Sequence, residues 1–417
     1  MSDYYQAPRW TGEILDCSLP VAMDTYNLCS YKCAYCFSQF QKSGVNKRAS
    51  KNFYNEHIVR TVDVNRVKKL FAGDIEDKQF SAWIKDKRPI QYGALADQFD
   101  ENERKMGCTL EILKTLCDNN YPVSFSTKAA WFTQDERYME LIKKQAENWN
   151  FKISIITLDE KKARLIERGV PSPAERLKAM KVLAEAGASV TLRLRPFILG
   201  VSDKTYLDLI EAAKEAGAQA LSTEFLCLDI RGKGFEYTAK CYDVLNSVCG
   251  FDIIDFYKKN STTQGYMRLN RSIKRPYVKR MKELCDRIGM RFYCSDAMFK
   301  ELSHNCCCCG LPDSWKFSRG NFSTAIQIAK TSGEVHFSDI AKELKQYTGH
   351  YKWRNNHGFN KGTAEKNTRF HEFSMYDYVH YCWNEKKLEK MFDGILIAAG
   401  TDNNGDVVYK YNRVVSC

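Results

Sequence analysis

Short apolar runs rich in β-forming residues alternate with amphipathic helical stretches between about residues 20 and 226. The strand-like runs cover residues 21–27, 90–95, 122–128, 151–157, 189–197 and 218–226. Strands that are separated by helices pair in parallel as β/α units. Six strands are too few for a closed eight-stranded barrel, so we expect an α/β fold with a partial parallel (β/α)6 barrel.

The sequence indicates where helices begin and end most clearly between residues 172 and 217. Ser172 is followed by Pro173 and Glu175, which is the pattern of an N-cap with proline in the first turn and a capping box. Gly187 is expected to end this helix. The next helix carries one apolar face and ends at Gly217; the face consists of Tyr206, Leu209, Ile210 and Ala213.

The pattern changes twice along the chain, which predicts three parts. Residues 1–230 form the barrel, with a polar insertion at about 40–88 that contains one helix near 63–71. Residues 231–313 are helical, basic and rich in cysteine. Residues 314–417 form a small α+β subdomain, with a helix at 338–348 and a terminal hairpin around Asn404-Gly405.

Composition limits the class of protein. Apolar residues make up 44% of 417 residues, and no run of about 18 apolar residues is present, so we expect no membrane span. The first residues show no signal-peptide pattern, which favours the cytoplasm. Seventeen cysteines in a reducing compartment indicate metal or redox chemistry rather than disulfides.

Three of these cysteines lie in one loop directly after the first predicted strand. Residues 29–36 read CSYKCAYC, with Cys29, Cys33 and Cys36 at spacings of four and three. Structural zinc takes four ligands, and each iron of a [4Fe–4S] cluster normally takes one cysteine. Three thiolates would therefore leave one iron open for a small molecule. A zinc loop and a group of inert thiols are the alternatives.

These cysteines, with the aromatic Tyr35 before the last, resemble the signature of the radical S-adenosylmethionine (SAM) superfamily. The resemblance implies a [4Fe–4S] cluster on Cys29, Cys33 and Cys36, and SAM chelated to the open iron. It also implies an electron donor such as flavodoxin or ferredoxin. The activity would be reductive cleavage of SAM to a 5′-deoxyadenosyl radical that abstracts hydrogen from a substrate.

Two further segments resemble the spore-photoproduct-lyase-like branch of that superfamily. QYGALADQFD (91–100) is similar to its glycine motif, with Ala94 in place of the second glycine, and FSTKAAW (125–131) is similar to its Ser-Thr-Lys segment. The resemblance implies that backbone carbonyls from Gly93 through Ala94 to Ala96 receive the SAM ammonium group. It places Ser126 and Lys128 near the methionyl carboxylate.

Residues 154–200 resemble the next part of the same branch. The resemblance places Ser154 near the sulfonium or ribose, Arg176 at the carboxylate and Arg195 near the adenosine. Each residue also has a plain structural interpretation, for example a surface arginine or a small core serine. Residues 4–39 are similar to radical SAM mobile pair proteins, which implies a second radical SAM protein as a partner.

A second cysteine group lies at residues 294–309 and ends in four consecutive cysteines. Neighbouring side chains diverge, so not all of them can bind one cluster. The interpretations left open are an auxiliary iron–sulfur cluster, a zinc site, a thiol that donates hydrogen, and inert thiols. The candidate metal ligands are Cys294, Cys306, Cys307, Cys308 and Cys309.

A basic strip completes the chemistry that the sequence offers. Residues 255–300 hold twelve Lys and Arg against four Asp and Glu. The strip is either a solvated helix face or a surface for nucleic acid. Three hypotheses follow: a radical SAM enzyme, lyase-like or oxidoreductase, acting on nucleic acid; one that modifies a peptide or protein with an auxiliary cluster; and a non-enzymatic iron–sulfur regulator that binds DNA.

Overall fold

The computed structural model describes residues 4–5, 7–11, 14–38, 59–230, 234–261, 263, 266–348 and 373–414. For residue 5 and residues 234–240 it describes the backbone alone. Predictions about residues 39–58, which form much of the expected insertion, lie outside the described residues.

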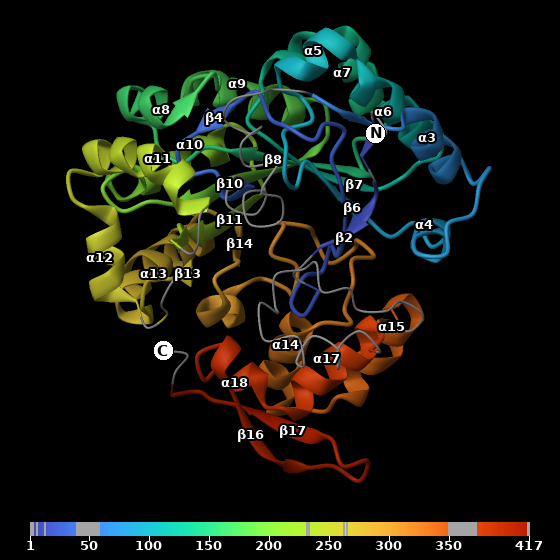
Figure 1. The fold of residues 1–417 in the computed structure, drawn as a ribbon, viewed down its shortest axis with the longest axis vertical. Coiled ribbons are helices and arrows are strands. Elements are labelled where there is room, and N and C mark those ends of the chain that lie inside the picture. Colours follow the sequence, from blue (N-terminus) through green and yellow to red (C-terminus); the bar gives the residue numbers. More distant parts are fainter. Residues whose placement is uncertain are drawn as a thin grey trace.

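A curved, mostly parallel sheet of eight strands forms the centre of the molecule (Figure 1). All six predicted strands are present, and the parallel strands β3 to β11 follow one another in chain order, as in a barrel. The prediction of a partial parallel α/β barrel is thus confirmed. In spatial order the strands are β14 (Arg291–Cys294), β11 (Ala220–Phe225), β10 (Ser189–Phe197), β8 (Trp149–Ser154), β7 (Val123–Thr127), β6 (Ile90–Tyr92), β3 (Val21–Met23) and β2 (Arg9–Trp10).

Two strands of this sheet were not predicted. β14 pairs in parallel with β11 and adds a seventh parallel strand, and β2 pairs antiparallel with β3. Residues 231–313 thus supply one strand of the barrel sheet. Both strands are short and contain no long apolar run that would predict them. Each pairs with an edge strand of the predicted sheet, whose backbone groups would otherwise be unpaired.

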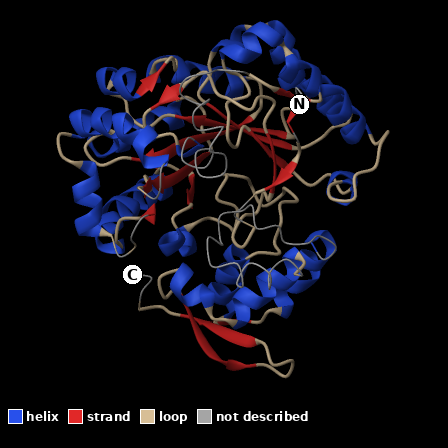
Figure 2. Ribbon diagram, viewed as in Figure 1, coloured by secondary structure: helices blue, strands red, loops and turns tan. Residues whose placement is uncertain are grey.

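Helices cover the outer face of the sheet (Figure 2). Phe125 of β7 and Phe151 of β8 stack at 4.8 Å between ring centroids in this outer core. The helix α9 (Pro173–Glu185) begins with the predicted capping box between Ser172 and Glu175. The other helices of this layer are α5 (Glu101–Met106), α6 (Cys108–Asp118), α7 (Glu136–Lys144), α8 (Glu160–Ile166), α10 (Tyr206–Glu215) and α13 (Arg271–Arg287).

The described part of the expected insertion belongs to this core. Helix α3 (Val64–Ala72) confirms the predicted helix, and Asp63 caps it by accepting a hydrogen bond from the backbone of Arg66. The ring of Phe71 meets Tyr121 edge to face at 4.8 Å. The strand β5 (Thr61–Val62) and the helix α4 (Ser81–Lys85) complete this region.

The C-terminal part packs below the sheet as helices on a small antiparallel sheet (Figure 1). The predicted hairpin is present as β16 (Leu396–Thr401) and β17 (Val407–Tyr411), and the predicted helix at 338–348 is α15. The third strand, β15 (Glu334–Val335), was not predicted. The remaining helices here are α14 (Phe322–Ser332), α17 (Met375–Asn384) and α18 (Lys387–Met391).

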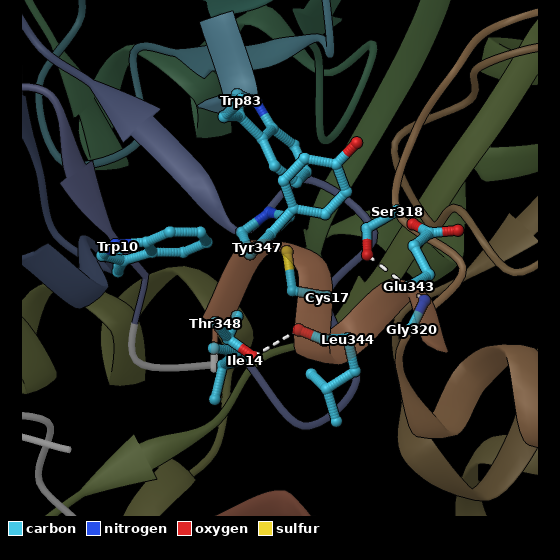
Figure 3. Close-up of a pocket in the computed structure, with 11 residues that line it drawn as sticks. Trp10, Ile14, Cys17, Trp83, Ser318, Gly320, Glu343, Leu344, Tyr347 and Thr348 are labelled. Carbon is cyan, nitrogen blue, oxygen red and sulfur yellow. Dashed lines mark hydrogen bonds between the residues drawn. The ribbon is translucent and has the colours of Figure 1, made fainter. Parts of the chain in front are cut away.

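An aromatic junction joins this part to the barrel around a small cavity (Figure 3). The rings of Trp83 and Tyr347 meet edge to face at 5.1 Å, and Arg88 pairs with Glu343 at 2.7 Å. The cavity has about 10 Å³, which is room for one water. It is therefore a packing feature and not a substrate site.

Some cations of the basic strip are buried or paired within the fold. It spans α12 (Ile253–Asn260), β13 (Tyr266–Met267) and α13. Lys274 is fully buried in an ion pair with Asp296, and Arg271 pairs with Asp393 at 2.8 Å. Exposed positions such as Lys279 and Arg280 remain on α13. Among the described helices, none is long and apolar enough to cross a membrane.

Candidate functional site

The three-cysteine loop follows β3 at the carboxyl edge of the parallel sheet. Cys33 lies in a two-residue strand, β4 (Lys32–Cys33), which pairs antiparallel with β9 (Glu167–Arg168). The backbone of Ala34 also donates a hydrogen bond to Ile166 at 2.8 Å. This ribbon ties the loop to the segment between α8 and α9, so distant parts of the chain set the position of the cysteines.

A buried network continues from that ribbon. The Tyr35 hydroxyl donates a hydrogen bond to Glu167, and Glu167 Oε2 lies 2.6 Å from Arg176 Nη2. Arg176 also donates to the carbonyl of Ser154 at 2.6 Å, from the end of β8. Arg176 is 1% exposed, so its guanidinium serves the network in this arrangement. The predicted role of Arg176 as a SAM ligand stays a prediction that this arrangement does not favour.

The thiols of the loop lie among buried charged groups. Burial raises the pKa of Cys33 to about 12, while the nearby Lys128 acts in the opposite direction. Burial also raises the pKa of Cys29, and the carboxylates of Asp97 and Asp100 add to that shift. The thiols of Cys29 and Cys33 are therefore protonated at neutral pH unless a metal displaces their protons.

Within the described ranges, no three Cys, His, Asp or Glu side chains gather closely enough to hold a metal ion. Cys29 and Cys36 are half-buried and Cys33 is buried. The donor chemistry suits an iron–sulfur cluster, since three thiols share one loop and a lysine lies beside them to offset thiolate charge.

A glycine turn after β6 approaches the same edge. Gly93 has φ +82°, and a Cβ at this position would lie 1.9 Å from Oε1 of Gln98 and 2.5 Å from the carbonyl oxygen of Ser126. Only glycine fits here, because both the conformation and the space exclude a side chain. Ala94 follows in the turn, and the backbone amides of Leu95 and Ala96 donate to Asp24 at 2.8 and 3.0 Å.

Two buried polar groups next to this turn have no hydrogen-bond partner in the described part of the chain. They are the side-chain amide of Gln98 and the hydroxyl of Ser126. Such groups are rare in folded proteins and call for an explanation. A ligand held between β6 and β7 would provide their partners.

Lys128 lies between this turn and the cysteine loop. Its backbone amide donates to Asp97 at 2.6 Å, and Thr127 donates to the same carboxylate at 2.7 Å. The Lys128 ammonium lies 5.6 Å from the centroid of the Tyr35 ring. The predicted neighbourhood of Ser126, Lys128 and Tyr35 is thus assembled at one edge of the sheet, while their roles toward SAM stay predictions.

The concave face of the sheet carries further charge. Arg195 of β10 forms an ion pair with Glu224 of β11. Although burial acts in the opposite direction, Arg195 and Arg268 lower the pKa of Glu224 to about 2. Arg195 is thus engaged with a carboxylate, and its predicted place beside the adenosine stays a prediction.

The second cysteine group does not converge as one site. Cys294 packs in the main core, whereas Cys306, Cys307 and Cys309 pack in a separate cluster with Cys17. The carbonyl oxygen of Cys308 accepts a hydrogen bond from Ser222 of β11 at 2.7 Å. The four-cysteine run therefore lies against the concave face of the sheet. Cys294 and the run lie in different packing clusters, and the auxiliary metal site expected on them stays a prediction.

Several residues of the site were missed by sequence reasoning. Glu167 and Gln98 gave no local signal, because their contacts are made across the fold. Cys17 packs against the four-cysteine run but lies far from it in the sequence. Lys152 and Arg193 did carry a signal, since each interrupts an apolar strand run with a charge.

The chain matches solved structures, whereas no family model and no curated protein matches it. Spore photoproduct lyase complexed with dinucleoside spore photoproduct is 12% identical, over 70% of this chain and 81% of that one, with a TM-score of 0.49. A spore photoproduct lyase variant with bound AdoMet and dinucleoside spore photoproduct is 15% identical, over 69% and 80%, with a TM-score of 0.47. Streptococcus suis SuiB bound to S-adenosylmethionine is 13% identical, over 67% and 51%, with a TM-score of 0.40.

Spore photoproduct lyase, whose branch the sequence motifs resemble, is thus among the structures that this chain matches.

Proposed function

We propose that this chain is a radical SAM enzyme, in which Cys29, Cys33 and Cys36 hold a [4Fe–4S] cluster and leave one iron to SAM. The observation that carries the proposal is the three-cysteine loop at the carboxyl edge of a parallel sheet, braced by β9 and faced by Lys128. When bound, the cluster supplies the electron that splits SAM and yields a 5′-deoxyadenosyl radical for hydrogen abstraction.

The chain's own residues prepare this edge in two ways. Lys128 places a half-buried cation beside Cys33 and Cys36, where it offsets the negative charge of thiolates. The Gly93 turn brings backbone close to β7, and the unpartnered groups of Gln98 and Ser126 offer hydrogen bonds to a polar ligand. The amino and carboxylate groups of SAM are a ligand of that chemistry.

The substrate hypotheses differ in what supports them. A nucleic acid is favoured by the exposed part of the basic strip on α13, although burial of Lys274 makes that strip weaker than the sequence suggested. A peptide or protein substrate is favoured by the packing of Cys17 with the four-cysteine run, which keeps thiols for a second cluster in one place. An electron donor such as flavodoxin or ferredoxin and a second radical SAM protein are proposed partners of this enzyme.

The deciding experiment is anaerobic reconstitution followed by iron counting, electron paramagnetic resonance and product analysis. We expect about four irons per chain on the loop, a reduced-cluster signal that changes on addition of SAM, and release of 5′-deoxyadenosine under reduction. Cys33→Ala should abolish all three, whereas Cys108→Ala, a thiol far from the loop in sequence, should retain them. A loaded cluster that ignores SAM would instead favour the iron–sulfur regulator, and zinc at the loop would exclude both.

A further inference from the structure

Two basic residues on the concave face of the sheet are not used by the fold. Lys152 of β8 is 1% exposed, yet its ammonium group has no hydrogen-bond or ion-pair partner in the described part of the chain. Arg193, on the neighbouring strand β10, is half-buried, and its guanidinium likewise has no partner there. A buried cation without a partner is destabilising, so a fold retains one where an anion compensates it.

The strand register places both cations around one spot. Lys152 is in register with Ser126 of β7 on one side and Thr191 of β10 on the other. Arg193 lies two residues beyond Thr191 and therefore points to the same face. The two cations therefore lie side by side on this face, next to the buried and unpartnered hydroxyl of Ser126.

The nearest protein anion does not satisfy them. Glu224 is the acidic residue closest in register, and it is already paired with Arg195. Burial, followed by the neighbouring charge of Arg195, lowers the pKa of Arg193 to about 10. Burial also lowers the pKa of Lys152, and repulsion from Arg193 contributes, although the neighbouring Cys309, Cys307 and Cys308 act in the opposite direction. This face therefore carries an excess of positive charge.

The end of the four-cysteine run lies against this face. Gly310 lies so close to Thr191 that a Cβ would meet its Oγ1 at 2.4 Å, and Ser222 holds the Cys308 carbonyl. Ser222 is in register with Arg193. The site thus has a floor made by residues 308–310 and a wall made by β8 and β10, close to the edge that carries the cysteine loop.

We propose that Lys152 and Arg193 bind an oxyanion group of the substrate. The inference rests on the proposed function, and it narrows the substrate to a molecule that carries a phosphate or a carboxylate. Such a group would anchor the substrate against β8 and β10, next to the edge where hydrogen abstraction is proposed to occur.

The test is thermal unfolding of the full chain against increasing phosphate at constant ionic strength. We expect phosphate to raise the unfolding midpoint of the natural protein, with succinate as the carboxylate probe in a parallel series. Lys152→Met should weaken the anion affinity at least about 10-fold, because a charge-assisted hydrogen bond is lost. Arg193→Met should act in the same direction. Lys181→Met, which removes an exposed lysine of α9, is the matched control and should behave like the natural protein.

The same variants separate a binding role from a structural one. Without added anion, Lys152→Met should be as stable as the natural protein or more stable, because an uncompensated buried charge has been removed. The proposal is overturned if neither phosphate nor succinate shifts the midpoint, or if the shift survives in Lys152→Met. It is also overturned if Lys152→Met leaves the anion response intact and changes only the alkylation rate of the cysteine run, since a thiolate would then be the partner of the lysine.

This titration needs neither cluster nor SAM. A failure of the oxyanion site would therefore leave the proposed cofactor chemistry standing. Conversely, a protein that showed the anion effect without SAM cleavage would keep the site and lose the proposed reaction.

Discussion

Arg176 Nη2 lies 2.6 Å from Glu167 Oε2, and each of these side chains is only 1% exposed. The pair is buried between the cysteine loop and β8, because Glu167 also accepts from Tyr35 and Arg176 also donates to Ser154. A buried ion pair contributes little net stability, but removal of one partner leaves a charge without compensation. We therefore expect the pair to hold the cysteine loop in position.

Glu167→Gln tests whether the ion pair of Arg176 and Glu167 positions the loop. The substitution keeps the size of the side chain and leaves the Arg176 cation without its carboxylate. We expect a loss of about 3–5 kcal/mol in the free energy of unfolding, measured in urea. If the cluster is bound as proposed, the reconstituted variant should also hold less iron, because the brace behind Tyr35 is weakened.

The matched control is the exposed pair of Lys181 and Glu185 on α9, whose side chains are 66% and 65% exposed. Glu185→Gln should change the free energy of unfolding by less than about 0.5 kcal/mol. Equal effects of the two substitutions would show that the buried pair has no special role in holding the loop.

Gly93→Ala tests the turn beside the proposed SAM site. A methyl group here would meet both the Gln98 side chain and the Ser126 carbonyl, and the backbone at φ +82° disfavours any residue with a Cβ. We expect a loss of about 1–3 kcal/mol in stability and a loss of SAM affinity in equilibrium dialysis. Gln98→Ala should not rescue the variant, because the carbonyl of Ser126 is main chain and cannot move aside.

Gly107→Ala separates the close approach from the backbone conformation. Gly107 also has positive φ, at +67°, but nothing lies within 4 Å of a Cβ placed there. The substitution should therefore cost only about 1 kcal/mol and leave SAM affinity unchanged. Similar SAM affinities in the two variants would count against the Gly93 turn as part of the site.

The barrel could be predicted from the sequence because its six predicted strands and their helices show local sequence patterns. The capping box at Ser172 and the hydrophobic face of α10 depend on residues three or four apart, and both are present as expected. The strand β14 has four residues and depends on the edge of β11, so no local pattern reveals it.

The site was predictable only where its chemistry lies in one segment. The cysteine spacing predicts the cysteine loop, and the Gly93 turn lies in one short motif with Gln98. Glu167 meets Tyr35 across 132 positions, and the cysteine run reaches Ser222 across 86. These contacts are set by strand order and packing, which a single sequence does not encode in readable form.

Glu301 makes the stability of the protein depend on pH. The side chain is 1% exposed, and burial raises its pKa to about 7, although the nearby Arg271 and Lys330 act in the opposite direction. In the unfolded chain the pKa is about 4.3. The folded state therefore holds its proton more tightly, so this contribution is complete below about pH 4.3 and is lost as the pH rises through about 7.

Glu301→Gln removes this dependence. Relative to the natural protein, the variant should gain stability between pH 5 and pH 8, by up to about 3 kcal/mol. Urea unfolding at the two pH values measures the change. Glu185→Gln, at an exposed position, should show no such gain. A gain of equal size at both pH values would show that Glu301 does not titrate in this range.

Gly310→Ala tests whether the four-cysteine run really lies against the concave face. Gly310 has φ +82°, and an added methyl group would meet Thr191 at 2.4 Å to Oγ1 and 2.6 Å to Cγ2. We expect the substitution to cost about 2 kcal/mol or more, through strain and overpacking together. Thr191→Ala in the same chain removes the second cause and leaves the first. The double variant should therefore recover roughly 1 kcal/mol relative to the sum of the single effects, which urea unfolding can resolve. Additive effects would mean that the two residues do not touch, and the floor of the proposed oxyanion site would then be missing.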